Sequence, residues 1–127
     1  MGKTAAELTK LERKKYRDLA VLEEESERRQ EAARRDKALA VAHTAAAVLK
    51  EVFGASRVFL FGSLAAGGRF HARSDIDLGV EGLRSEDYWR ADCRIEGVGG
   101  DLEIELVDLQ TASAALAQAI RRDGREL

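Results

Sequence analysis

The chain has 127 residues, 45% of them hydrophobic and 35% charged, with a formal net charge of −2. This length is enough for one small domain with its own core, and the charge excludes a uniformly basic nucleic-acid binder. A single cysteine excludes an intrachain disulfide, so we expect a reducing, cytoplasmic setting. We also expect no membrane span and no secretory signal, because no apolar run approaches about 18 residues and the N-terminus lacks an apolar signal core.

Charge is distributed unevenly along the chain. Residues 1–50 carry 12 Lys and Arg against 9 Asp and Glu, whereas residues 51–127 carry 9 against 14. An excess of carboxylates in the second part is expected where a divalent cation neutralises a cluster of them.

The first expected element is helical. Residues 4–53 contain neither Gly nor Pro and consist mostly of good helix formers, which predicts one long helix or two abutting ones. Near its end, apolar residues at helical spacing predict a face that packs on the core: Val41, Ala45, Val48, Leu49, Val52 and Phe53. Residues 10–37 are mostly charged and fit either a solvated, salt-bridged helix or a partner-binding arm through which the chain could oligomerise. We therefore divide the chain into a charged helical extension, 1–38, and a domain, 39–127.

Shorter elements follow, after Gly54 ends the long helix. They are, in chain order, a buried strand at 57–61, a short helix at 63–66, a strand at 75–80, a short helix capped by Ser85, a turn at 97–100, a strand at 102–109 and a last helix that begins at Thr111 or Ser113 and ends at Gly124.

The stretch from residue 59 to residue 80 reads FLFGSLAAGGRFHARSDIDLGV and carries most of the chemistry. Asp75 and Asp77 alternate with Ile76 and Leu78, so on a strand the two acids share one face and the two apolar residues the other. Two adjacent carboxylates repel each other unless a cation lies between them. Mg²⁺ suits such oxygen ligands and completes its shell with water and substrate phosphates.

A third acid on a neighbouring strand would complete a two-metal site for phosphoryl or nucleotidyl transfer. The strand at 102–109 offers Glu103, Glu105 and Asp108. Glu105 is the first choice because it is central and flanked by apolar residues, while Glu103 and Asp108 remain alternatives.

The Gly62-Ser63 pair is a candidate phosphate site. Gly62 lets the backbone approach a phosphate closely, and the Ser63 hydroxyl and nearby amides can donate to it. Arg69 and Arg73, in the loop that follows, could screen the charge of a triphosphate. Taken singly, Gly-Ser is an ordinary turn and Asp-x-Asp an ordinary surface pair; their order along strand, loop and strand favours a metal–nucleotide site.

Together these residues resemble the DNA polymerase β-type nucleotidyltransferase superfamily, and within it the minimal nucleotidyltransferase (MNT) group, over residues 39–127. Gly62-Ser63 matches the first motif, SDIDLGV the Asp-x-Asp motif and IELVDL the strand of the third acid. Three departures stand out: the spacer before Asp75 is one residue longer than usual, Ala66 stands where the family often has Arg, and the third acid is Glu105 where Asp is commoner.

The resemblance implies an α/β (α+β) fold, with a small mixed β-sheet, helices packed on one face and a long preceding N-terminal helix. It implies that Asp75 and Asp77 bind Mg²⁺, that Glu105 binds a second metal or serves as base, and that Gly62 and Ser63 hold the triphosphate of ATP.

Members of this group often pair with a HEPN-domain protein in toxin–antitoxin systems. The resemblance therefore implies an antitoxin that transfers AMP from ATP to a tyrosine hydroxyl of a HEPN-type toxin. The alternative is a catalytically weak binding module that neutralises its partner by contact. Neither reading implies a membrane partner or direct nucleic-acid binding.

Overall fold

The computed structural model describes residues 9–127, so the expected helical residues 4–8 lie outside the described part. The elements are α1 (Lys10–Glu51), β1 (Arg57–Phe61), α2 (Ser63–Ala66), β2 (Ile76–Glu81), the 3₁₀ turn η2 (Ser85–Asp87), α3 (Tyr88–Gly99), β3 (Ile104–Asp108), α4 (Ala114–Asp123) and β4 (Arg125–Glu126). Among the helices described, none is long and apolar enough to cross a membrane.

The four strands form one sheet in the order β3-β2-β1-β4. β2 runs antiparallel to β1 and parallel to β3, so the predicted mixed sheet is confirmed. In this register Asp77 on β2 lies between Phe61 on β1 and Glu105 on β3. The centre of the sheet thus brings the Asp-x-Asp strand next to the strand of the third acid.

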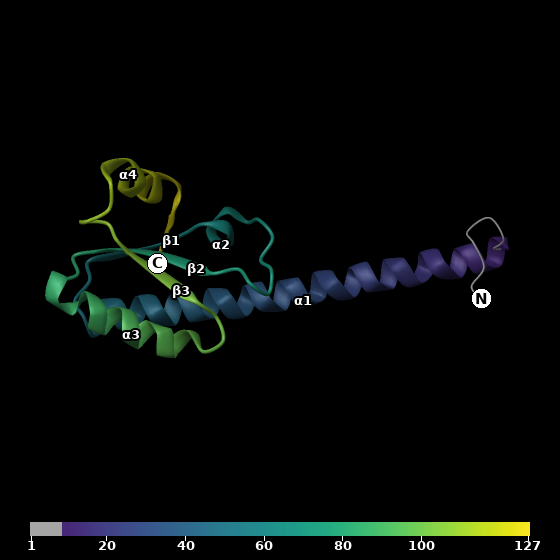
Figure 1. Ribbon diagram of the computed structural model, residues 1–127, viewed down its shortest axis with the longest axis horizontal. Helices are drawn as coiled ribbons and strands as arrows, with labels where there is room; N and C mark the ends of the chain where they lie inside the picture. Colours follow the sequence, from purple (N-terminus) through teal and green to yellow (C-terminus); the bar gives the residue numbers. More distant parts are fainter. Residues whose placement is uncertain (1–8) are drawn as a thin grey trace.

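The helices α1 and α3 cover one face of the sheet (Figure 1), as predicted. The docking face of α1 is as expected at Ala45 and Leu49, which are buried, and at Val41, Val48 and Phe53, which pack partly buried against the core. The other fully buried positions are alanines: Ala38, Ala42 and Ala46. Val52 was expected in the core but is exposed, since α1 ends at Glu51 and the chain turns away. Alanine side chains let a helix lie close to the strands that it covers.

A smaller cluster lies on the opposite face, where α4 packs. It contains Phe59, Leu109, Ala117 and Ile120. Gly79 on β2 makes room for it, because a Cβ there would lie 3.0 Å from Cγ2 of Ile120. α4 therefore covers part of the face that also carries Asp77 and Glu105, in addition to the predicted helices on the other face.

The N-terminal half of α1 projects away from the rest of the molecule (Figure 1). Thr9 caps it, with its hydroxyl accepting a hydrogen bond from the amide of Glu12 at 3.1 Å. Burial on α1 begins at Ala38, close to the boundary expected between extension and domain.

Several local expectations were wrong. Ser85 does not cap a helix: it is the first residue of η2, and the N-cap positions of η2 and α3 are Arg84 and Asp87. The stretch predicted as a turn at 97–100 is mostly helical, because α3 continues to Gly99 and only Gly100 has a positive φ, of 60°. The short strand β4 was not expected at all; it pairs with β1, with Phe59 opposite Glu126.

Candidate functional site

Two carboxylates define the centre of the candidate site. Asp77 and Glu105 occupy paired positions on the parallel strands β2 and β3. Both belong to the face opposite to the buried Ile76 and Leu78, so side-chain alternation holds as predicted. Asp75 immediately precedes β2 and lines an acidic hollow of about 380 Å³ together with Glu103 and Glu105.

The electrostatics of this pair are unfavourable without a counter-charge. Burial, the neighbouring Glu105 and, to a smaller extent, Asp75 raise the pKa of Asp77 to about 6. Each cause disfavours the ionised carboxylate. A cation placed beside Asp77 and Glu105 would remove the repulsion, which is the behaviour expected of metal-binding carboxylates.

Gly62 brings the first motif into contact with the acids. It has a φ of 77°, and a Cβ built there would lie less than 3.0 Å from Oδ2 of Asp77. The Asp77 carboxylate therefore lies directly over the backbone at Gly62, and Ser63 follows as the first residue of α2. A phosphate bound at the Gly62-Ser63 turn would therefore also lie beside the Asp77 carboxylate.

The two loop arginines are placed differently. Arg73 lines a hollow of about 410 Å³ with Asp75 and Glu103, at the edge of the acidic cluster. Arg69 is exposed on the loop, and no contact joins it to Asp77 or Glu105 in the described structure.

An arginine that sequence reasoning missed holds this loop. Arg35 on α1 donates hydrogen bonds to the carbonyl of Leu64, at 2.9 Å, and to that of Gly68. One helical turn earlier, Oε1 of Glu31 accepts a hydrogen bond from the amide of Phe70 at 3.0 Å. The i,i+4 spacing of Glu31 and Arg35 is the only sequence signal, and it is equally typical of a solvated helix.

Asp108 is placed unlike the other candidate acids. It is nearly buried, and its Oδ1 accepts a hydrogen bond from the amide of Gln110 at 3.0 Å. It pairs with Val80 rather than with Asp77. Its side chain therefore stabilises the turn after β3, whereas Glu105 is the acid beside Asp77.

A metal ion bound here would need ligands in addition to the protein side chains. Within residues 9–127, no three His, Cys, Asp or Glu side chains converge to hold an ion by themselves. The carboxylates of Asp77 and Glu105 nevertheless offer adjacent oxygen ligands, and their negative charges repel each other. That donor set fits Mg²⁺, which usually takes one or two carboxylates and completes its shell with waters and phosphate oxygens.

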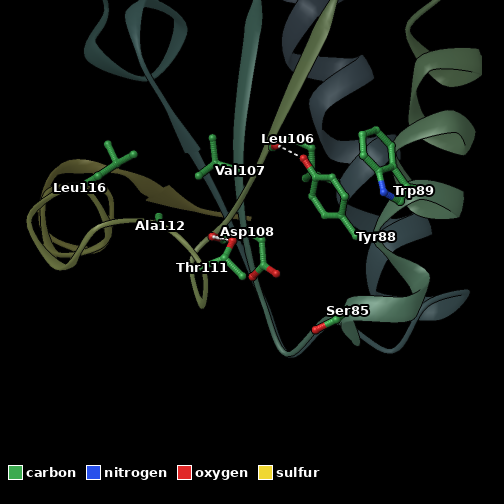
Figure 2. Close-up of a pocket in the computed structure, with 9 residues that line it drawn as sticks. All are labelled: Ser85, Tyr88, Trp89, Leu106, Val107, Asp108, Thr111, Ala112 and Leu116. Carbon is green, nitrogen blue, oxygen red and sulfur yellow. Dashed lines mark hydrogen bonds between the residues drawn. The ribbon is translucent and has the colours of Figure 1, made fainter.

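A second hollow, of about 440 Å³, opens at the free edge of β3 (Figure 2). Its lining is mostly apolar and includes Leu106, Val107, Leu116, Tyr88 and Trp89. Trp89 is 73% exposed and meets Tyr88 edge to face, with ring centroids 5.7 Å apart. Val107 lies two residues after Glu105 on the same face of β3, so this hollow adjoins the acidic pair.

Tyr88 closes the inner side of this hollow. Its hydroxyl donates a hydrogen bond to the carbonyl of Leu106 at 2.6 Å (Figure 2). Burial, Asp92, Asp108 and Glu105 raise the pKa of Tyr88 above its ordinary value. The phenol therefore remains protonated and keeps this donor.

The sequence pattern of the family described as polymerase beta, nucleotidyltransferase matches residues 43–127. The chain belongs to this family. That membership agrees with the mixed sheet and with the order of Gly-Ser turn, Asp-x-Asp strand and third-acid strand. Among curated proteins no sequence match was found.

Solved structures similar to this nucleotidyltransferase include one described as a minimal nucleotidyltransferase, with 30% identity, a TM-score of 0.52 and coverage of 76% of this chain and 91% of that one. A toxin–antitoxin complex, MntA–HpeT, has 25% identity and a TM-score of 0.50 over 62% of this chain. This chain spans 65% of the length of that MntA–HpeT chain. A toxin–antitoxin structure with AMP-PNP has 24% identity and a TM-score of 0.50, over 72% and 70% of the two chains, and supports the fold alone.

Proposed function

We propose that this nucleotidyltransferase transfers AMP from ATP to a side-chain hydroxyl of a partner protein and depends on Mg²⁺. The observation that carries the proposal is the contact of Gly62 with Asp77, which is itself paired with Glu105. This arrangement joins a place for phosphates to a place for a cation. We further propose that the acceptor is a tyrosine of a HEPN-type toxin in the cytoplasm, on the strength of the similarity to toxin–antitoxin structures.

Each residue has a defined task in this proposal. The backbone at Gly62 and the hydroxyl of Ser63 hold the triphosphate. Arg73 lies in the hollow with Asp75 and Glu103 and offsets the negative charge of the acids there. Asp77 and Glu105, with Asp75 beside them at the start of β2, would hold Mg²⁺ with the help of water and phosphate oxygens, and the ion would supply positive charge for the phosphates and the leaving group. The acceptor oxygen forms a bond to the α-phosphorus, the α–β phosphoanhydride bond breaks, and pyrophosphate leaves. Glu105 takes the proton of the acceptor hydroxyl.

The order of the strands gives the transfer a direction. Gly62 follows β1 and Glu105 lies on β3, so the two residues flank Asp77 from opposite sides of β2. In-line displacement places the attacking oxygen opposite to the leaving pyrophosphate. The triphosphate therefore lies toward β1, and the acceptor approaches from β3, over the hollow that contains Trp89.

A second candidate function is neutralisation by contact, without catalysis. It is favoured by the lack of three convergent metal-binding side chains within residues 9–127, and by Ala66 at a position where an arginine would contact phosphate. In that case the same surface would bind the toxin and leave it unmodified.

Intact-mass measurement separates the two functions. The purified protein is incubated with ATP, Mg²⁺ and the co-expressed partner, and the partner is expected to gain the mass of one or more AMP groups. Asp77→Asn should abolish the gain, and Glu103→Gln, outside the Asp77 pairing, should retain it. An unmodified partner that is still neutralised by both wild type and Asp77→Asn would establish the contact mechanism instead.

A further inference from the structure

We infer that the projecting part of α1, residues 10–30, pairs antiparallel with the same segment of a second copy of this chain. This segment is called the arm below. The inference concerns assembly and does not depend on nucleotidyl transfer.

The arm lies outside the folded domain. It extends beyond the sheet and the other helices (Figure 1). The hydrogen bonds from α1 to the loop after α2 come beyond the arm, at Glu31 and Arg35. Leu19 and Leu22 in its middle are each 57% exposed. The arm therefore presents large apolar side chains that nothing in the described chain covers.

The three leucines of the arm form one stripe. At about 100° per residue, Leu11, Leu19 and Leu22 fall within about 80° of the helix circumference. Lys15 and Ser26 lie on the same stripe. About a midpoint between residues 20 and 21, Leu19 exchanges with Leu22, whereas Lys15 exchanges with Ser26 and Leu11 with Gln30. A two-fold pair about this midpoint places Leu19 of each copy against Leu22 of the other.

Charge fixes the direction of pairing. Residues 10–17 carry five Lys or Arg and one Glu, whereas residues 23–27 carry four Glu and no Lys or Arg. In a parallel pair, each block would face its own copy and repel it. In an antiparallel pair with the midpoint above, the basic block of one copy lies along the acidic block of the other. Charges that flank an apolar seam select partner and orientation in this way.

The length of the arm keeps the two domains apart. Twenty-one residues at about 1.5 Å each span roughly 30 Å, so the domains emerge at opposite ends of the helix pair. The start of each arm then reaches the region of Glu31 in the other copy, where the loop at Phe70 is held. Both candidate sites remain open to nucleotide and partner.

The mass of the full chain in solution is the first test. Light scattering or sedimentation is expected to give twice the 14.0 kDa of one chain. Raising the salt to about 1 M, where the Debye length is about 3 Å, should shift the protein toward the single-chain mass. A single-chain mass at concentrations up to roughly 1 mM, where even a Kd near 1 mM would be detected, would overturn the inference.

Exchanging the charge blocks tests the direction. One variant carries Lys14→Glu, Lys15→Glu and Arg17→Glu, a second carries Glu24→Lys, Glu25→Lys and Glu27→Lys, and a third carries all six. The first two should be single chains because their blocks repel. The third should pair with itself again and, when tagged, should fail to capture the wild type. Capture of the wild type by the third variant would indicate parallel pairing and refute the antiparallel one.

Substitutions on and off the stripe test the seam. Leu19→Asn with Leu22→Asn should give single chains, whereas Val21→Asn should leave the pair intact, since Val21 is similarly exposed at 52% but lies off the stripe. Circular dichroism checks that each arm is still helical, and Leu19→Ala with Leu22→Ala replaces the Asn pair if helix is lost. A wild type of single-chain mass whose toxin affinity falls with these leucine variants would assign the arm to the toxin and overturn the inference.

Discussion

Gly62 lies so close to Asp77 that any side chain there would overlap the carboxylate. A Cβ at Gly62 would fall 3.1 Å from Cγ of Asp77 and closer still to its Oδ2. The backbone of the Gly-Ser turn and the central acid of the sheet are thus one packed unit, and a change in either must alter the other.

Gly62→Ala is expected to damage both stability and nucleotide binding. Gly62 has φ 77° and ψ −158°, a backbone region open essentially to glycine alone, so alanine there costs about 1–3 kcal/mol, and overlap with Asp77 adds to this. Gly67→Ala is a control for positive φ alone, because Gly67 has φ 76° and ψ 8°, in the ordinary left-handed region, and no atom within 4 Å of an added Cβ. Thermal unfolding and Mg²⁺-ATP titration measure the two effects. Equal losses in both variants would show that contact with Asp77 contributes nothing.

Asp77 should make the metal-free protein less stable as the pH rises. Its pKa is raised to about 6, whereas an unfolded aspartate has a pKa of about 3.9. Between these values the folded state holds the extra proton, so the free energy of unfolding falls with increasing pH and the full loss is reached above pH 6.

Asp77→Asn removes this titration and should flatten the pH dependence. Urea unfolding in the presence of a chelator, at a series of pH values from about 4 to 8, compares the variant with the wild type. Added Mg²⁺ should recover stability above pH 6 in the wild type alone. If the free energy of unfolding changed with pH in the same way for both proteins, Asp77 would not be the cause of the pH dependence.

Glu105→Gln and Asp108→Asn should separate catalysis from stability. Glu105→Gln is expected to reduce transfer by about 10²-fold or more, since it removes the proposed base, and to lower the pKa of Asp77 because a like charge is lost. Asp108→Asn weakens the bond from the Gln110 amide, costs about 1 kcal/mol and should retain transfer. Steady-state rates and denaturant unfolding test both variants. The reverse pattern would make Asp108 the third acid.

Arg35→Ala should loosen the loop after the Gly-Ser turn. Loss of its bonds to the Leu64 and Gly68 carbonyls is expected to cost about 1 kcal/mol and to weaken ATP binding. Arg35→Lys should not rescue the loop, because an ammonium lacks the fork that spans two carbonyls. Hydrogen exchange of residues 64–70 reports the loosening directly. Arg28→Ala, on the exposed arm, serves as control, and equal protection in both variants would count against the role of Arg35.

Trp89→Ala should weaken recognition of the acceptor and leave nucleotide binding unchanged. Trp89 is largely exposed beside the hollow, so its removal should change stability by less than about 0.5 kcal/mol. The KM for the partner should rise while the KM for ATP stays constant. Val52→Ala removes an exposed apolar side chain elsewhere. A partner KM that is equal in both variants would place the acceptor away from this hollow.

Much of the domain follows from local pattern. Alternation of Ile76 and Leu78 with the acids determines the face that each side chain takes, and Gly124 ends α4 where expected, whereas α1 ends at Glu51, before Gly54. Ser113 caps α4, with its hydroxyl accepting from the amide of Leu116 at 3.2 Å. These features depend on neighbours within a few residues, which a sequence displays directly.

The parts that could not be predicted depend on contacts between distant segments. β4 has only two residues, too few for an alternation signal, and exists because Arg125 and Glu126 meet β1. Gly97 remains helical because α3 is packed on the sheet and on α1. Arg35 is hydrogen-bonded to Leu64 and Gly68, which follow it in the sequence by 29 and 33 positions. Glu105 was the first choice from the sequence, but only the strand register separates it from the alternative Asp108, by pairing Glu105 with Asp77 and Asp108 with Val80.

β3 is an outer strand, and in its pairing with β2 the backbone groups of Leu106 point away from the sheet. Such a margin can recruit a strand from another molecule and so begin sheet aggregation. The phenol of Tyr88 already occupies the Leu106 carbonyl at the midpoint of β3. An intruding strand would have to displace it before a continuous ladder could grow. Tyr88 thereby protects the edge of β3 from pairing with strands of other molecules. The hollow beside Tyr88 remains accessible to a folded partner.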